Sequence, residues 1–148
     1  MKSEKTSGPL SLPELGQRIA PRVFGPFARE ALALYAAASG DNNPLHLDPS
    51  AAKSAGLQDT PVHGMLMFAC FEPYLSGWRP DLFIARLSCK FLRPVFAGEG
   101  ITISGRVVGK APAPGKEIIV RLMARAPNHD LALVGEASMR CKDGCPAR

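Results

Sequence analysis

The feature that most constrains the fold is a change of hydrophobic period at Pro80. Beyond it, apolar residues alternate with polar ones, as they do in strands that bury one face. The connections around 97–99, 111–115 and 127–130 are short, whereas parallel crossovers need about a dozen residues or more. The second half therefore predicts an antiparallel meander, with an earlier strand near Arg18–Phe24 completing the sheet. The inward-facing residues we expect are Phe83, Ala85, Leu87, Cys89 and Phe91, then Ile101, Ile103 and Val107, then Ile118, Val120 and Leu122, and then Leu131, Leu133, Ala137 and Met139.

The first half of the chain carries two helical patterns. The stretch 65–75 is apolar apart from Glu72 and Pro73, which predicts a helix buried on all sides in the core. A buried helix against a curved antiparallel sheet makes an α+β domain. An earlier Ala-rich stretch predicts a second helix, and Gly40 is well placed to end it. The residues at helical spacing that we expect on one face of this earlier helix are Phe27, Ala31, Leu34, Tyr35 and Ala38.

Length and composition predict a single soluble domain. The chain has 148 residues, of which 46% are hydrophobic and 21% charged, so disorder is excluded over most of its length. A chain this long buries on the order of 70% of its unfolded surface and needs no disulfide or metal to fold. No stretch approaches the ~20 apolar residues of a membrane span, and the run 1–8 lacks the apolar segment of a signal peptide. We expect one domain over 1–148, loose at 1–10 and 143–148, in the cytoplasm.

Charge and cysteine content narrow the possible partners. The net charge is +5, but Lys and Arg are scattered singly, which disfavours a nucleic-acid partner. A mild positive field suits a small anionic ligand that carries phosphates. Cys70 and Cys89 lie in apolar segments, as small core residues do, and Cys141 and Cys145 have no second pair with which to bind zinc. We therefore expect reduced thiols and no structural metal, with His129 in a solvated turn.

The loop 39–48, SGDNNPLHLD, holds the most chemically capable side chains. Asp41 and His46 lie five residues apart, and a folded loop can direct a carboxylate and an imidazole at one water molecule. Such a pair can perform acid–base chemistry near neutral pH. Local chemistry alone leaves a structural alternative open, in which Asp41 holds an Asx turn and His46 is a hydrogen-bonded core residue. We assign Asp48 to the N-cap of a short helix at 49–53.

A second candidate is the segment 61–66, PVHGML, at the entry to the apolar helix. The first N–H groups of a helix lack internal partners, and Gly64 allows a ligand to approach them. Such N–H groups can hold a carbonyl oxygen on which negative charge develops. Equally, Gly64 can simply relieve crowding at the helix entry, with His63 packed or capping nearby. A metal site formed by Asp41, His46 and His63 lacks the i, i+4 histidine spacing of a helical zinc site, so we expect no metal.

Taken together, these segments resemble the MaoC-like dehydratases, the family that includes the (R)-specific enoyl-CoA hydratases. The family signature is an aromatic residue, then a Ser/Thr-Gly-Asp-x-Asn-Pro-Leu-His-x-Asp run, then small residues. Here Tyr35 precedes the run SGDNNPLHLD, and Ala51 and Ala52 follow it. Two weaker family features are VHGML at 62–66 and KFLRPVFAGE at 90–99, whose last position is more often Asp in the family. The resemblance extends over 18–142, nearly the whole chain.

The resemblance implies a hot-dog fold, in which an antiparallel sheet wraps around a long central helix, here 64–75. It also implies that Asp41 and His46 are the catalytic pair, that Asn43 is a supporting polar residue, and that Gly64 is the oxyanion-hole glycine. The implied reaction is reversible syn addition of water to a trans-2-enoyl thioester of coenzyme A or acyl carrier protein, with no metal or redox cofactor. Hot-dog domains usually pair edge to edge, and an uncapped edge strand is an aggregation liability, so we expect a homodimer.

Two other functions are compatible with this resemblance. Hot-dog folds also host thioester hydrolysis, because a fold does not determine a function. Thioesterases of this fold lack the D-x-N-P-x-H loop that this chain carries at 41–46. The other alternative is a non-catalytic partner subunit of a heterodimeric dehydratase, against which the intact pair of Asp41 and His46 argues.

Overall fold

The computed structural model describes residues 11–111 and 116–142. The two chain ends that we expect to be loose, Cys145, and positions 112–115 of a predicted turn lie outside these residues. The described strands are β1 (Arg18–Phe24), β2 (Leu82–Phe91), β3 (Ile101–Lys110), β4 (Glu117–Arg125) and β5 (Leu131–Cys141). The described helices are α1 (Arg29–Ser39), the 3-10 turn η1 (Pro44–His46), α2 (Pro49–Ser54), α3 (Gly64–Ala69) and α4 (Phe71–Trp78).

The described strands form one antiparallel sheet in the order β1-β3-β4-β5-β2. The predicted meander is confirmed for β3, β4 and β5, and the early strand β1 joins β3. It is wrong for β2, which pairs with β5 at the far edge instead of with β3. The connection 92–100 crosses one end of the sheet and is held there, because the Val62 N–H donates to the Val95 carbonyl at 2.7 Å. Because the connection 92–100 is anchored to the segment of Val62, it is not a hairpin turn, and β2 and β3 are not neighbours in the sheet.

The predicted facing of β2 is wrong over its first half. The pairing with β5 shifts register between Ile84 and Arg86, so Ala85 forms a bulge. An extra residue reverses the alternation of side chains, since the period of a strand is two. Leu82 is consequently buried and Phe83 is 43% exposed, the reverse of the expectation. Beyond the bulge, Leu87 and Cys89 pack against the core as predicted, whereas Phe91, at the end of the strand, is 48% exposed and not buried.

The central helix is divided and is buried on one face only. Helix α3 ends at Ala69 and α4 begins at Phe71, in part because Pro73 has no N–H to donate to the Ala69 carbonyl. Met65 is 53% exposed, so the expectation of burial on all sides is wrong. The Tyr74 hydroxyl donates to β1 backbone carbonyls, and burial raises its pKa to about 12. The buried side chains of α3 and α4 are Met67, Phe71, Tyr74 and Leu75.

Helix α1 has the predicted end but a different buried face. Gly40 adopts a left-handed conformation with φ of 80°, and its N–H donates to the Ala36 carbonyl at 2.9 Å. The buried residues are Leu32 and Ala36, whereas Leu34 is 72% exposed. In an Ala-rich helix, small side chains lie on every face, so the sequence alone does not show which face is buried. The elements against which the helix packs determine that face.

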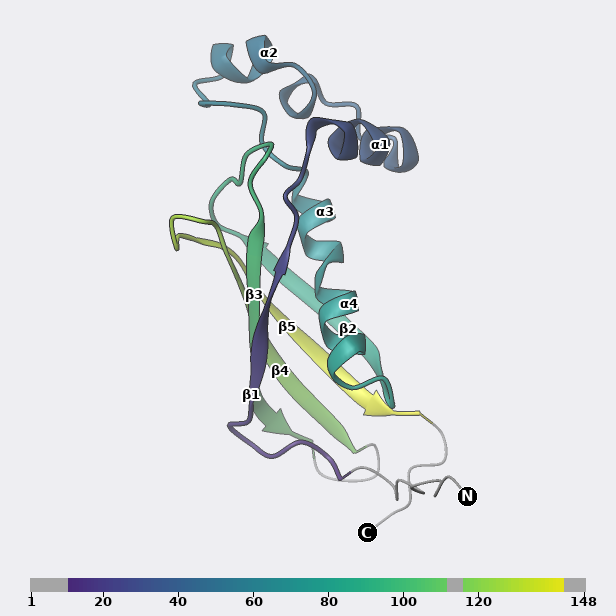
Figure 1. Ribbon diagram of the computed structural model, residues 1–148. Helices are drawn as coiled ribbons and strands as arrows, with labels where there is room; N and C mark the ends of the chain where they lie inside the picture. The colour runs from purple at the N-terminus through teal and green to yellow at the C-terminus, as the bar shows by residue number, and fades with distance from the viewer. Residues whose placement is uncertain (1–10, 112–115, 143–148) are drawn as a thin grey trace, which may run out of the picture.

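The sheet curves around α3 and α4, which run along one of its faces, as the resemblance implied (Figure 1). Helices α1 and α2 lie beyond one end of the sheet, at the end where α3 begins. The two segments that carry the candidate chemistry, 39–48 and 61–66, are therefore both at this end. None of the described helices is long and apolar enough to cross a membrane. The sheet residues that are fully buried against the helices include Ile103, Val107, Val120, Leu122, Ala137 and Met139.

Candidate active site

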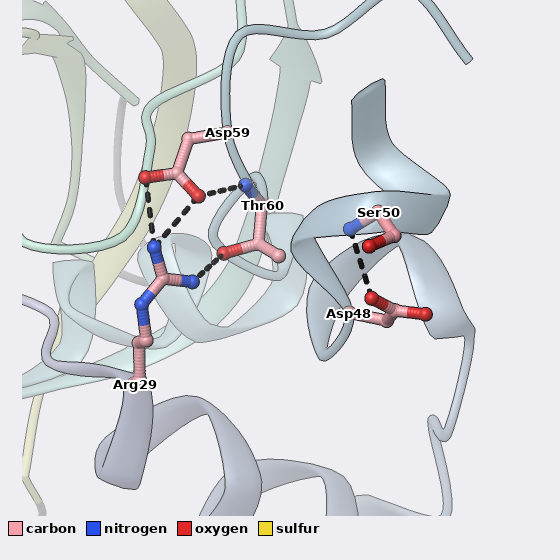
Figure 2. A network of polar contacts seen from close by, with 5 residues as sticks. All are labelled: Arg29, Asp48, Ser50, Asp59 and Thr60. Atoms are coloured by element: carbon pink, nitrogen blue, oxygen red, sulfur yellow. Dashed lines mark hydrogen bonds and ion pairs between the residues drawn. The ribbon is translucent and has the colours of Figure 1, made fainter. Parts of the chain in front are cut away.

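The side chains of the loop 39–48 first of all shape the loop itself. The Asp41 carboxylate accepts a hydrogen bond from the Asn43 N–H at 3.4 Å, as in an Asx turn. The Asn43 side chain accepts from the Leu45 N–H at 3.1 Å and so caps η1. Asp48 accepts from the Ser50 N–H at 2.8 Å, which confirms its assignment to the N-cap of α2 (Figure 2). The turn-forming roles that local chemistry left open for Asp41 are thus present, and its carboxylate is exposed to solvent.

An ion pair ties α1 to the segment that leads into α3. The Arg29 guanidinium, at the start of α1, donates to both oxygens of Asp59 at 2.8 and 2.9 Å and to the Thr60 hydroxyl at 3.0 Å (Figure 2). The hydrogen bonds from Arg29 lower the pKa of the Asp59 carboxyl below its usual value. These contacts hold Asp59 and Thr60, and with them the segment that leads into α3, close to the start of α1.

His46 is oriented by a backbone carbonyl of this second segment. Its Nδ1 lies 2.7 Å from the Pro61 carbonyl oxygen. A carbonyl can only accept, so Nδ1 carries the hydrogen and Nε2 of the neutral ring is left as the acceptor. His46 and Leu47 also line a hollow of about 420 Å³ together with residues of α1. His46 is therefore only partly buried and can be reached from solvent.

His63, for which the sequence predicts only a packing or capping role, lies between the loop of Asp41 and His46 and the start of α3. It makes no capping bond to α3. Instead its ring stacks on His46, with centroids 4.1 Å apart and planes 25° apart, and its Nε2 lies 3.2 Å from the Asp41 carbonyl oxygen. Burial lowers the pKa of His63 below its usual value. The only sequence signal for this role was the position of His63 directly before Gly64.

Gly64 is the first residue of α3, so its N–H precedes the first hydrogen bond of the helix. A Cβ at this position would lie only 2.9 Å from Cε1 of Phe91, at the end of β2. The ring of Phe91 is therefore the group that a larger side chain at position 64 would crowd. An N–H that serves as an oxyanion donor is compatible with the same geometry and stays a prediction.

Asp41, His46 and His63 could each offer a ligand atom, and these atoms lie within 4.8 Å of one another. The sequence offered these three residues as a candidate metal site, which their spacing disfavoured, and the fold brings His63 from the segment 61–66 to the loop that carries Asp41 and His46. However, the lone pair of an imidazole nitrogen lies in the ring plane, and two stacked rings do not direct their lone pairs at one ion. The cluster therefore suits proton transfer better than metal binding.

Comparison with known proteins identifies the family. The profile described as the MaoC like domain matches residues 12–124. The chain belongs to the MaoC-like domain family. The match includes the loop 39–48, the segment 61–66 and the run 90–99 on which the resemblance was based.

Two curated relatives and one solved structure are similar to this chain over most of its length. The chain is 31% identical over 131 residues to the (R)-specific enoyl-CoA hydratase of Aeromonas caviae, covering 86% of this chain and 94% of the hydratase. It is 32% identical over 114 residues to the mitochondrial 3-hydroxyacyl-[acyl-carrier-protein] dehydratase of Arabidopsis thaliana, covering 76% and 69% of the two chains. The structure of the (R)-hydratase from A. caviae superposes with a TM-score of 0.80 at 30% identity, over 88% of this chain and 98% of the hydratase. The predicted hot-dog fold is thereby confirmed.

Proposed function

We propose that this MaoC-like protein is an enoyl-thioester hydratase, which adds water reversibly to a trans-2-enoyl thioester to give the (R)-3-hydroxyacyl thioester. The observation that carries the proposal is the meeting of Asp41 and His46 with the segment of Gly64, in a chain similar over most of its length to an (R)-specific hydratase. The names of both relatives denote hydration or dehydration of acyl thioesters.

The proposed mechanism assigns one task to each group. The Gly64 N–H donates to the thioester carbonyl oxygen, which makes Cβ electrophilic and stabilises the enolate that forms. Asp41 and His46 hold one water molecule, whose oxygen bonds to Cβ. One of the pair accepts the proton that the water loses, and one supplies a proton to Cα on the same face. Asn43 supports the pair by capping η1, the turn that carries His46.

The alternatives predict different products from the same substrate. We expect purified protein to bleach the ultraviolet absorbance of crotonyl-CoA as its double bond is hydrated. A thioesterase would instead release free thiol, and a non-catalytic partner subunit would do neither. A panel of enoyl thioesters that varies in chain length and in carrier, coenzyme A or acyl carrier protein, then defines the substrate.

We further propose a homodimer that forms along the free edge of β2. The free edge of β1 carries Pro21 within an irregular stretch of pairing, and proline at an edge discourages further strand pairing. The β2 edge lacks proline and has large apolar side chains near it, with Phe91 48% and Met65 53% exposed. Because Phe91 also lies against Gly64, the thioester would bind near the subunit interface. Size-exclusion chromatography with light scattering should give the mass of two chains, and a monomer at micromolar concentration would refute the dimer.

We also propose that the chain acts as one domain in the cytoplasm. Cys70 and Cys89 are outside disulfide bonds, as is usual in a reducing compartment. Both thiols pack against the core, and burial raises the pKa of each. Fractionation of cells that produce the tagged protein should recover it with cytoplasmic markers.

A further inference from the structure

We propose that His63 is a positioning residue that holds both Asp41 and His46 in the geometry the reaction needs. The inference rests on the proposed hydratase activity and goes beyond it, since it concerns a side chain that need not touch the substrate. It follows from two contacts that His63 makes and from the burial of its ring.

The first contact fixes the backbone of Asp41. His63 Nε2 lies 3.2 Å from the Asp41 carbonyl oxygen, which can only accept, so Nε2 carries the hydrogen. The two residues are 22 positions apart, and the bond links the catalytic loop directly to the start of α3. The carboxylate of Asp41 is exposed and has few other constraints, so the position of its backbone determines where it can reach.

The second contact fixes the plane of His46. The His63 ring stacks on one face of His46 at a centroid distance of 4.1 Å, while the Pro61 carbonyl holds the Nδ1 edge at 2.7 Å. A ring held at a face and at an edge has little freedom to rotate. Pro61 and His63 are two residues apart, so a single segment orients His46. Tyr35 of α1 packs against His63 in turn, with centroids 4.8 Å apart.

The burial of His63 indicates that its ring nitrogens have a role beyond filling space. The residue is fully buried, and its Nδ1 has no hydrogen-bond partner among the described residues. A buried polar atom without a partner is destabilising, and a phenyl ring would fill a similar space without that penalty. Burial also lowers the pKa of His63, so the ring stays neutral with its hydrogen on Nε2. The hydrogen bond to Asp41 is the feature that a phenyl ring could not supply.

Two variants of His63 separate the two contacts. His63→Phe retains a flat ring against His46 but loses the donor to Asp41, and His63→Gln retains an N–H donor but loses the stack. We expect either change to lower kcat by about 10²-fold, the cost of misplacing reacting groups by about 1 Å, with KM little changed. His129→Asn is the matched control, and the activity of this variant should equal that of the wild type. His129 is exposed in a turn, and asparagine tolerates its φ of 68°.

A third comparison tests whether His63 acts through Asp41. In an Asp41→Asn background, His63→Phe should add little further loss of kcat, because the group it positions is already disabled. A purely structural role for His63 predicts a lower Tm with an unchanged kcat for the folded protein, and that result would overturn the inference. If crotonyl-CoA is not hydrated even by the wild-type protein, the proposed function fails instead.

The wild-type protein allows a test that does not depend on whether the variants fold. Two-bond ¹H–¹⁵N correlation spectra of the histidine rings distinguish the two neutral tautomers from the charged form. At pH 7 we expect His63 to be neutral with hydrogen on Nε2, and neutral His46 to carry hydrogen on Nδ1. A charged His63, or a His63 with hydrogen on Nδ1, would contradict the hydrogen bond to Asp41 on which the inference depends.

Discussion

Replacing Gly64 by alanine and by proline isolates the contribution of one N–H group to the rate. Both variants add a Cβ, but only proline removes the N–H. Proline suits the site for two reasons, since Gly64 is the first residue of α3 and His63 before it is extended, with ψ of 126°. The backbone should therefore accept either residue without unwinding the helix.

The effect of these changes on stability should be small. The new Cβ would lie 2.9 Å from Cε1 of Phe91, whose half-exposed ring can turn aside. Moving that ring off its preferred rotamer costs about 0.5–1.5 kcal/mol, and the higher helix propensity of alanine offsets part of this. We expect Gly64→Ala to change the free energy of unfolding by no more than about 1 kcal/mol, or Tm by about 2–4 °C.

The effect on rate should differ strongly between the two variants. Gly64→Ala crowds the approach of the thioester carbonyl, so some loss of kcat is expected. Gly64→Pro should lose a further ~10²–10³ in kcat, the usual cost of removing one oxyanion donor. Hydration of crotonyl-CoA by each folded variant gives the comparison. Gly77→Ala is the control, because Gly77 is exposed in α4 and a Cβ there meets only Arg22 at 3.5 Å. If the proline and alanine variants are folded and equally active, the Gly64 N–H is not an oxyanion donor.

Two further predictions concern the pair of Asp41 and His46 and the ion pair of Arg79 and Asp81. Asp41→Asn and His46→Gln should each lower kcat by about 10²–10⁴-fold, and the double variant should lose little more than the worse single variant. Asp48→Asn is the control and should stay active. Full activity of folded Asp41→Asn would exclude the proposed mechanism. The Arg79 guanidinium, which donates to Asp81 at 2.7 Å, lowers the pKa of that carboxyl from its ordinary value of 3.8. The stabilisation is present above the ordinary pKa and is lost as the pH falls through the lower folded value. Urea unfolding should therefore show Asp81→Asn less stable than wild type at pH 7, with the difference shrinking in acid; an equal difference at both pH values would count against the ion pair.

Features that depend on neighbours along the chain were predictable from the sequence. The alternation of β3, β4 and β5, the end of α1 at Gly40 and the capping of α2 by Asp48 each follow from residues within a few positions of one another. The chemistry of the loop 39–48 was recognisable for the same reason, because its residue types and their spacing form one continuous motif. The sequence alone therefore predicts the site residues that belong to this motif, Asp41, Asn43 and His46.

Features that depend on contacts between distant segments required the tertiary structure. Periodicity could not reveal that β2 pairs with β5, nor that a bulge at Ala85 reverses its inward face, since both depend on the partner strand. The contact of Phe91 with Gly64 arises only after the edge strand meets the start of α3. In the same way, His63 reaches Asp41 and His46 only because two separate segments fold against each other, which local spacing does not encode.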